Sequence, residues 1–236
     1  MKRDAPAADP REEVARVARA VVRAGLAGAF GHVSARRDDG GFVITSTRPL
    51  GAASAGDLIE VSVDGDVAGE RTTDVPLELA LHRAIYDARP DVGGICRGHP
   101  MSVVRWGAGL TPVPLRHGLG LIAGHVVPVY ADVTLVEDAP AAAAAAAALG
   151  SHQSMILRGN GGLAVGASAL DAATRLYFLE ERALLALDPP PAARVGEAAW
   201  AARSAATDRE LRRAARWFAA AHGGPIPYAP GPESGE

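Results

Sequence analysis

The segment Gly93-Gly94-Ile95-Cys96-Arg97-Gly98-His99 is the part of this sequence that decides the fold. Its apolar start, Gly93–Cys96, predicts a buried strand, and the turn Arg97-Gly98-His99 then presents two polar side chains at the end of that strand. The preceding stretch, Ala88-Arg89-Pro90-Asp91-Val92, contains a proline that ends a helix. The sequence therefore predicts a helix, a buried strand and a polar turn in direct succession.

A second polar turn, Arg158–Gly162, lies further along the chain between the predicted strands Met155–Leu157 and Leu163–Val165. The glycines on both sides of Asn160 indicate a hairpin with left-handed backbone. Two interpretations of Asn160 stay open: it either hydrogen-bonds a substrate or tolerates the left-handed turn.

Hydrophobic spacing and turn residues predict the other elements. Apolar residues at three-to-four spacing predict an amphipathic helix over residues 11–24 that ends at Gly25. Further helices are predicted over 76–88, opened by Pro76, and over 102–107, 140–149, 169–187 and 196–221. Further strands are predicted over 32–36, 41–45, 58–63, 113–115 and 126–130. This order favours a largely antiparallel sheet with helices packed on its faces.

The length of 236 residues fits one large domain with a helical tail. We expect a disordered leader at 1–10, the main domain at 11–188, a C-terminal helical extension at 189–222 and a disordered tail at 223–236. Pro189-Pro190-Pro191 separates the domain from its extension.

Composition narrows the classes of function. A net charge of −3 argues against a nucleic-acid partner, because binding to phosphate backbones needs a basic face. Cys96 is the only cysteine, which fits a reducing cytoplasm, and its apolar neighbours indicate a small buried hydrophobe. The polar N-terminus has no secretory signal, and the alanine stretch at 141–148 is too short to span a membrane. We expect a cytoplasmic protein of ordinary enzyme composition.

Several segments, taken in order, resemble the class II aldolase/adducin family. They are Gly31-His32-Val33-Ser34-Ala35-Arg36, Phe42–Thr45, Asp57–Ile59, Glu78-x-x-x-His82-x-x-Ile85-Tyr86, Ala88–Val92, Arg97–His99 and Leu157–Gly161. The residues in these segments are most similar to those of the family branch that contains decarboxylases of hydroxylated aromatic or pyridine carboxylic acids. The resemblance implies an α/β fold, an αβα sandwich, in a homo-oligomer (tetramer or dimer) with its active site between subunits.

The resemblance also implies three histidines that hold a divalent metal and one glutamate that acts as acid and base. The glutamate corresponds to Glu78 and the second ligand to His99, while Arg97 and Asn160 occupy the other two ligand positions. One imidazole and one carboxylate would hold zinc, manganese or iron weakly, and a guanidinium repels a dication. We therefore prefer no cofactor, with His99 as a metal ligand only if a divalent metal is bound.

Catalytic roles follow from the chemistry of these side chains. Arg97 is expected to bind a substrate carboxylate or a developing oxyanion bidentately. His99 and Glu78 are expected to transfer protons, although Glu78 could instead cap the helix that it starts. His82, one helical turn after Glu78, is expected to be structural and to pack or orient that carboxylate.

The remaining candidates, His32, Ser46, Arg48, His117 and Asn160, are expected to bind substrate. His117 offers an alternative in which it rebuilds a metal site with His99 and Glu78. The loop Thr45-Ser46-Thr47-Arg48 lacks the Pro-Thr-Gly run with which aldolases of this family bind phosphate, which argues against a phosphorylated substrate.

The leading hypothesis is a lyase that decarboxylates a small anionic, hydroxylated aromatic or enolisable carboxylic acid without a metal. One alternative is a metal-dependent aldolase-type lyase or an iron oxygenase with a rebuilt metal site. A second alternative is a non-catalytic, adducin-like binding or assembly protein, for which the loss of two ligand histidines is the expected sign.

Overall fold

The computed structural model describes residues 9–68, 74–188 and 195–223 of the chain. The predicted leader at 1–10 and tail at 223–236 therefore lie almost wholly outside the described residues, as does the proline run at 189–191. In the described ranges no helix is long and apolar enough to cross a membrane.

The centre of the molecule is one sheet with the strand order β3-β2-β1-β4-β7-β6-β5. Its strands are β1 (His32–Arg36), β2 (Phe42–Ile44), β3 (Ile59–Val61), β4 (Gly94–Gly98), β5 (Val129–Tyr130), β6 (Ser154–Leu157) and β7 (Gly162–Gly166). All neighbouring strands pair antiparallel except β5 and β6, which are parallel. The prediction of a largely antiparallel sheet is confirmed, and so is the hairpin of β6 and β7.

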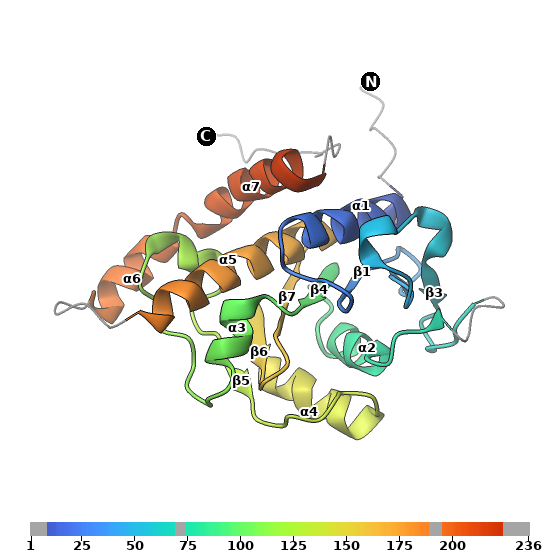
Figure 1. Cartoon of the computed structure of the whole chain (residues 1–236), viewed down its shortest axis with the longest axis horizontal. Coiled ribbons are helices and arrows are strands. Elements are labelled where there is room, and N and C mark those ends of the chain that lie inside the picture. The colour runs from blue at the N-terminus through green and yellow to red at the C-terminus, as the bar shows by residue number, and fades with distance from the viewer. Residues whose placement is uncertain (1–8, 69–73, 189–194, 224–236) are drawn as a thin grey trace.

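Helices cover both faces of this sheet (Figure 1). The α1 and α5 helices lie over one face, α2 and α4 lie over the other, and α7 packs outside α1 and α5. Their bounds are α1 (Pro10–Arg23), α2 (Leu79–Ala88), α3 (Met101–Trp106), α4 (Ala139–Leu149), α5 (Ala169–Leu187), α6 (Glu197–Ser204) and α7 (Thr207–Phe218). The predicted αβα sandwich is thereby confirmed.

The helix ends follow from capping residues. Asp9 accepts a hydrogen bond from the Arg11 amide at the start of α1, and Asp138 accepts one from the Ala141 amide at the start of α4. Gly25 ends α1 with a φ of +72°, the left-handed conformation that glycine adopts without steric cost. Local sequence therefore sets the ends of one helix in each of the two covering layers.

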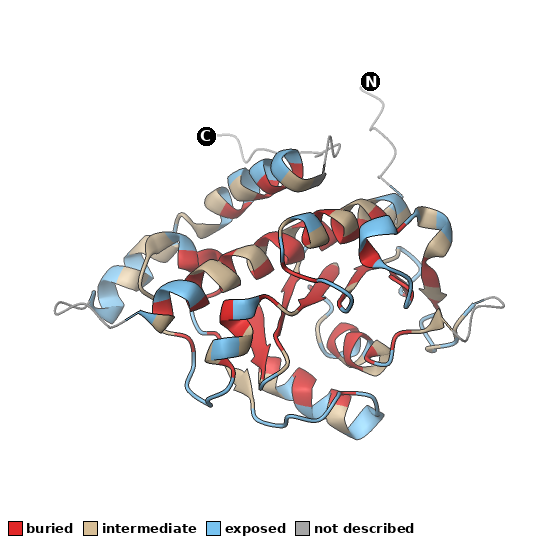
Figure 2. Cartoon of the chain, in the orientation of Figure 1, coloured by how far each residue is buried: buried red, intermediate tan, exposed pale blue. Residues whose placement is uncertain are grey.

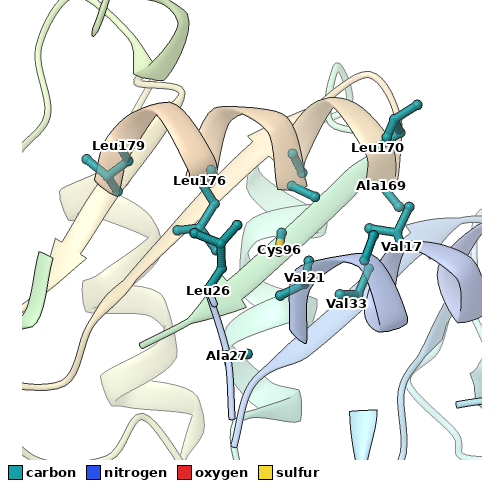
Figure 3. Close-up of a cluster of buried hydrophobic side chains, with 14 of the residues drawn as sticks. Val17, Val21, Leu26, Ala27, Val33, Cys96, Ala169, Leu170, Leu176 and Leu179 are labelled. Carbon is teal, nitrogen blue, oxygen red and sulfur yellow. The ribbon is translucent and has the colours of Figure 1, made fainter. Parts of the chain in front are cut away.

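Two apolar clusters hold the layers together. On the α1–α5 side, Cys96 and Val33 of the sheet pack with Val17, Val21 and Leu176 (Figure 3). On the α2–α4 side, the cluster is formed by sheet residues such as Ile95 and Leu163 with helix residues such as Leu81 and Leu149. The buried residues follow the sheet and the inner helix faces (Figure 2). Each fully buried leucine or valine contributes roughly 1.5–3 kcal/mol relative to an exposed one.

Four expected elements differ in the structure. Residues 113–115 form a loop rather than a strand, since Pro112 and Pro114 lack the amide protons that a strand needs for pairing. The strand predicted at 126–130 is reduced to β5. The second helix begins at Leu79 rather than at Pro76, and the extension at 196–221 divides into α6 and α7.

Candidate active site

The polar turns of the sequence meet because β4 lies in the middle of the sheet. In the pairing of β1 with β4, His32 lies opposite Arg97, and in the pairing of β4 with β7, Gly98 lies opposite Gly162. The turn with His99 and the turn with Asn160 therefore leave the sheet side by side. Because side chains alternate along a strand, Arg97 points to the α2 side, away from the face of Cys96.

Glu78, at the start of α2, lies beside the residues that the sheet brings together. We call this group the polar corner: His32, Glu78, Arg97, His99 and Asn160. It occupies the N-cap position, but its side chain makes no capping hydrogen bond. Instead, Oε2 lies 3.2 Å from Nε of Arg97 and 3.8 Å from Nδ1 of His32. Glu78 therefore does not cap α2 through a hydrogen bond, although it lies at the helix start where the helix dipole favours a carboxylate, and it forms a buried ion pair with Arg97.

Arg97 is completely buried, and its Nη1 donates a hydrogen bond of 2.6 Å to the Gly98 carbonyl. The Gly161 backbone closes over the guanidinium: a Cβ at this residue would lie 3.1 Å from Nη1 and would clash with the Gly98 oxygen. Gly161 also has a φ of +86°, so only glycine fits both the space and the backbone. The expectation that Arg97 itself meets a substrate does not match this placement, because its guanidinium lies behind Glu78 with no exposed surface.

Burial and the positive charge of Arg97 lower the pKa values of two histidines in this corner. Burial, assisted by Arg97 and then His99, lowers the pKa of His32 to about 3. Burial and then Arg97 lower the pKa of His99 to about 4, although the Phe30 carbonyl and the Asn160 side chain oppose the shift. Both imidazoles are therefore neutral near pH 7. His99 thus offers a neutral N–H rather than the imidazolium that an acid role would use.

His82 lies behind the corner and is fully buried. Its Nδ1 lies 2.8 Å from Oγ of Ser34, which in turn lies 2.8 Å from the hydroxyl of Tyr86. Burial lowers the pKa of His82, so the ring is neutral and joins this hydrogen-bonded chain. The contacts are those of a structural histidine that ties α2 to β1.

A cavity of about 440 Å³ opens in front of this corner. Its polar lining residues are His32, Ser46, Thr47, Arg48, Glu78, His99 and Asn160. Apolar side chains form the other walls, and Phe30 and Leu77 among them are 75% and 63% exposed. Six of the eight candidate residues of the sequence thus line one cavity. A larger hollow of about 1080 Å³ between α2 and α4 is lined mainly by aliphatic residues and does not reach them.

Several polar atoms at this corner are buried and have no hydrogen-bond partner in the protein. Three of them, Glu78 Oε1, His32 Nδ1 and His99 Nδ1, belong to residues that line the cavity, and Arg97 Nη2 lies behind these residues. Buried polar atoms nearly always have a partner, and leaving one unmade costs about 1–3 kcal/mol. A group of such atoms around one cavity indicates a place for a polar ligand or for water.

Two candidates lie differently from what the sequence suggested. His117 lies with its Nε2 2.8 Å from Glu181 Oε1 on α5 and does not line the cavity, so one chain does not bring it to His99 and Glu78. Arg48 lines the rim, but its guanidinium is paired with Asp57 at 3.0 Å and with Asp74 at 3.6 Å. Its charge is therefore largely compensated within the protein.

The donor set does not fit a divalent ion. Over the residues that the structure describes, no three His, Cys, Asp or Glu side chains are grouped so that they could hold a metal. Arg97 has no lone pair to donate, and its guanidinium occupies the place beside Glu78. The rebuilt site of His99, His117 and Glu78 is not assembled within the chain either.

Sequence reasoning missed the apolar walls of the cavity, Phe30, Leu77 and Leu135. These are isolated apolar residues in loops or at a helix start, and no periodic pattern marks them. It also missed the complete burial of Arg97. The alternation of side chains along Gly94–Gly98 could have indicated that burial, since residue 97 shares a face with Ile95. Asn160 itself has no left-handed backbone; Gly159 and Gly161 adopt it instead.

Comparisons with known proteins show which family the chain resembles. Residues 12–187 match the model of the class II aldolase and adducin N-terminal domain. The chain is 31% identical over 195 residues to 3,4-dihydroxyphthalate decarboxylase of Arthrobacter keyseri, a match that covers 76% of this chain and 78% of that protein. It is 30% identical over 226 residues to 3-oxo-tetronate 4-phosphate decarboxylase of Cupriavidus necator, with coverage of 88% and 97%.

Solved structures show the same fold. L-fuculose-1-phosphate aldolase from Thermus thermophilus superposes with a TM-score of 0.65 at 28% identity, over 74% of this chain and 92% of that chain. L-fuculose 1-phosphate aldolase from Glaciozyma antarctica gives a TM-score of 0.75 at 20% identity, over 91% and 90%. The family model covers most of the chain, and the sheet, the two helical layers and the polar corner all lie within it. This chain belongs to the class II aldolase and adducin family.

Proposed function

We propose that this protein is a carbon–carbon lyase that decarboxylates a small hydroxylated aromatic carboxylic acid. The observation that carries the proposal is the group of buried, unpartnered polar atoms on Glu78, His32 and His99 at one end of a cavity with apolar walls. Its decarboxylase relatives support the reaction type.

The lining of the cavity favours an aromatic ring over a sugar phosphate. Phe30, Leu77 and Leu135 offer apolar surface for a planar ring, while the only arginine among the described lining residues, Arg48, is already paired with two aspartates. A phosphate dianion would find no free countercharge among those lining residues, since His32 and His99 are neutral. A carboxylate carried on an apolar ring suits this environment better.

The reaction breaks the bond between the ring carbon and the carboxylate. Glu78 accepts the proton of the substrate hydroxyl, and neutral His99 donates its N–H to a substrate oxygen. CO2 leaves without the bonding electron pair, which remains on the ring carbon. That carbon then takes the proton from Glu78, and the oxyanion of the hydroxyl takes one proton from solvent. Each turnover therefore releases one CO2 and consumes one proton.

A direct test measures CO2 release from 3,4-dihydroxyphthalate, from related hydroxybenzoates and from 3-oxo-tetronate 4-phosphate. We expect turnover of an aromatic substrate and a loss of about 10²- to 10⁴-fold in the Glu78→Gln variant. The matched control is Glu60→Gln, because Glu60 also pairs with arginines, Arg11 and Arg37, but lies outside the cavity. Full activity of Glu78→Gln on an identified substrate would contradict the assigned role. Turnover of the phosphorylated substrate alone would contradict the aromatic class.

We also propose that the protein works as a homo-oligomer whose subunits meet near the cavity. Phe30 and Leu77 at the cavity mouth are large apolar side chains with most of their surface exposed. Exposed apolar groups gathered beside a site favour a covering partner. Light scattering of the purified chain tests this: a dimer or tetramer is expected, and a stable monomer with full activity would contradict it.

A further inference from the structure

Arg97 holds a fixed position that no flexible surface arginine would keep. Its guanidinium is buried between β4, the β6–β7 turn and the start of α2, with Nη1 bound to the Gly98 carbonyl and Nε facing Glu78. A Cβ at Gly161 would lie 3.1 Å from Nη1, so a larger residue at this positive-φ position would crowd the guanidinium. The cation is therefore part of the frame of the site.

The Arg97 guanidinium lies beside the Glu78 carboxylate and close to both histidines of the cavity. Arg97 directly precedes the turn with His99, it faces Glu78 at 3.2 Å, and its strand neighbour is His32. A second positive centre at this corner would be repelled by the guanidinium, and Glu78 already has its countercharge. The corner thus holds one permanent positive charge supplied by the protein.

We infer that Arg97 is a positioning residue that takes over the electrostatic role of a divalent ion: it neutralises and orients the Glu78 carboxylate so that the site works without a bound metal. The claim that Arg97 orients Glu78 for catalysis rests on the proposed function. The claim that the site binds no metal does not depend on it. Arg97 acts through Glu78, because its own surface does not reach the cavity.

The first experiment measures the metal content of the full-length protein purified without chelator, and then its metal binding after chelator treatment. Elemental analysis should find no stoichiometric metal, and cobalt(II) titration should give no ligand-field absorption band. In the Arg97→His/Asn160→His variant, which joins two further imidazoles to His99, one equivalent of cobalt(II) should bind and produce such a band. Stoichiometric metal retained by the wild-type protein, or tight cobalt binding by it, would overturn the inference. The wild-type measurement decides this even if the double variant does not fold.

The second experiment separates positioning from a merely structural role through the pH profile of kcat/KM. The titratable groups that face Glu78 are Arg97 and His32, with His99 across the same cavity. Replacing Arg97 by Met removes the positive charge beside the site, so the acidic limb should move to higher pH. In Arg97→Lys, which keeps the charge, the limb should move less. An unchanged acidic limb in Arg97→Met would overturn the positioning role.

The two failures remain distinguishable. If the protein decarboxylates none of the tested acids, the proposed function fails, while the cobalt titration still decides whether the corner excludes a metal. If the wild-type protein binds metal but decarboxylates, the proposed function stands and the inference about Arg97 falls.

Discussion

The two faces of β4 place their side chains in opposite environments: one face is apolar, and the other carries a buried charge. On one face, Cys96 packs among apolar side chains of α1 and α5, such as Val21 and Leu176 (Figure 3). On the other face, Arg97 lies buried against Glu78 and leaves Nη2 without a partner. Both residues are 0% exposed, so burial alone does not distinguish them.

One face therefore stabilises the fold, and under the proposed function the other face serves the reaction. An apolar face lowers the free energy of the fold by removing surface from water. A buried ion pair with unpartnered atoms contributes little net stability, since desolvation offsets most of the attraction. The α2 side of the strand end is therefore best explained by the cavity in front of it, and substitutions on the two faces should have different consequences.

The largest effect on the free energy of unfolding is expected when only one partner of the buried Arg97–Glu78 ion pair is removed. Arg97→Met leaves the Glu78 carboxylate buried without its countercharge, which should lower the free energy of unfolding by about 3–5 kcal/mol. Urea denaturation at pH 7 measures this. A loss below that of an exposed ion pair, such as Arg89–Asp91 probed by Asp91→Asn, would mean that Arg97 is not buried against Glu78.

A comparable but somewhat smaller effect is expected on the apolar face. Leu176→Ala opens a cavity between α5 and the sheet and should cost about 2–5 kcal/mol in unfolding free energy. Its folded fraction should keep its catalytic rate, since Leu176 belongs to the α1–α5 cluster. A specific activity that falls along with the stability would show that the two faces are coupled.

An effect that grows with acidity should appear when pH is lowered below the ordinary histidine pKa. His32 and His99 have pKa values of about 3 and 4 in the fold against an ordinary value near 6.5, so the unfolded chain binds more protons in that interval. Stability should be unaffected above pH 6.5 and fall as pH drops toward 4, by about 1.4 kcal/mol per pH unit for each proton. Denaturation midpoints at pH 7, 5.5 and 4.5 measure the trend. The slope should flatten in His32→Asn; an identical slope would contradict neutral burial of His32.

The smallest effect on stability is expected when both partners of the polar face are neutralised. In Arg97→Met/Glu78→Gln no buried charge remains, and the free energy of unfolding should stay within about 1–2 kcal/mol of the wild type or rise. The comparison with Arg97→Met alone isolates the coupling between the two side chains. A double variant as unstable as the single one would indicate that packing, rather than charge, dominates this corner.

The sequence predicts most of the fold because its signals are local. The capping of α1 at Asp9 and Gly25, the alanine run of α4 and the glycine turn at 158–162 each specify one element by themselves. The strand predicted at 113–115 is wrong. Its apolar residues fit a strand pattern, but the two prolines beside Val113 lack the amide protons with which a strand pairs.

The site is less predictable, since it depends on contacts between distant segments. The motifs identified Glu78, His99 and Asn160, which line one cavity. They did not indicate that Arg97 lies behind Glu78, nor that His117 turns toward Glu181, because both facts depend on strand pairing and helix packing. Apolar wall residues such as Phe30 carry no sequence pattern at all.

The most direct test of the account is the rate of CO2 release by Arg97→Met/Glu78→Gln on the aromatic substrate that the wild-type protein turns over. We expect a protein that is folded and nearly as stable as the wild type but slower by about 10²- to 10⁴-fold. A folded double variant with the wild-type rate would contradict the claim that this buried polar pair exists for chemistry.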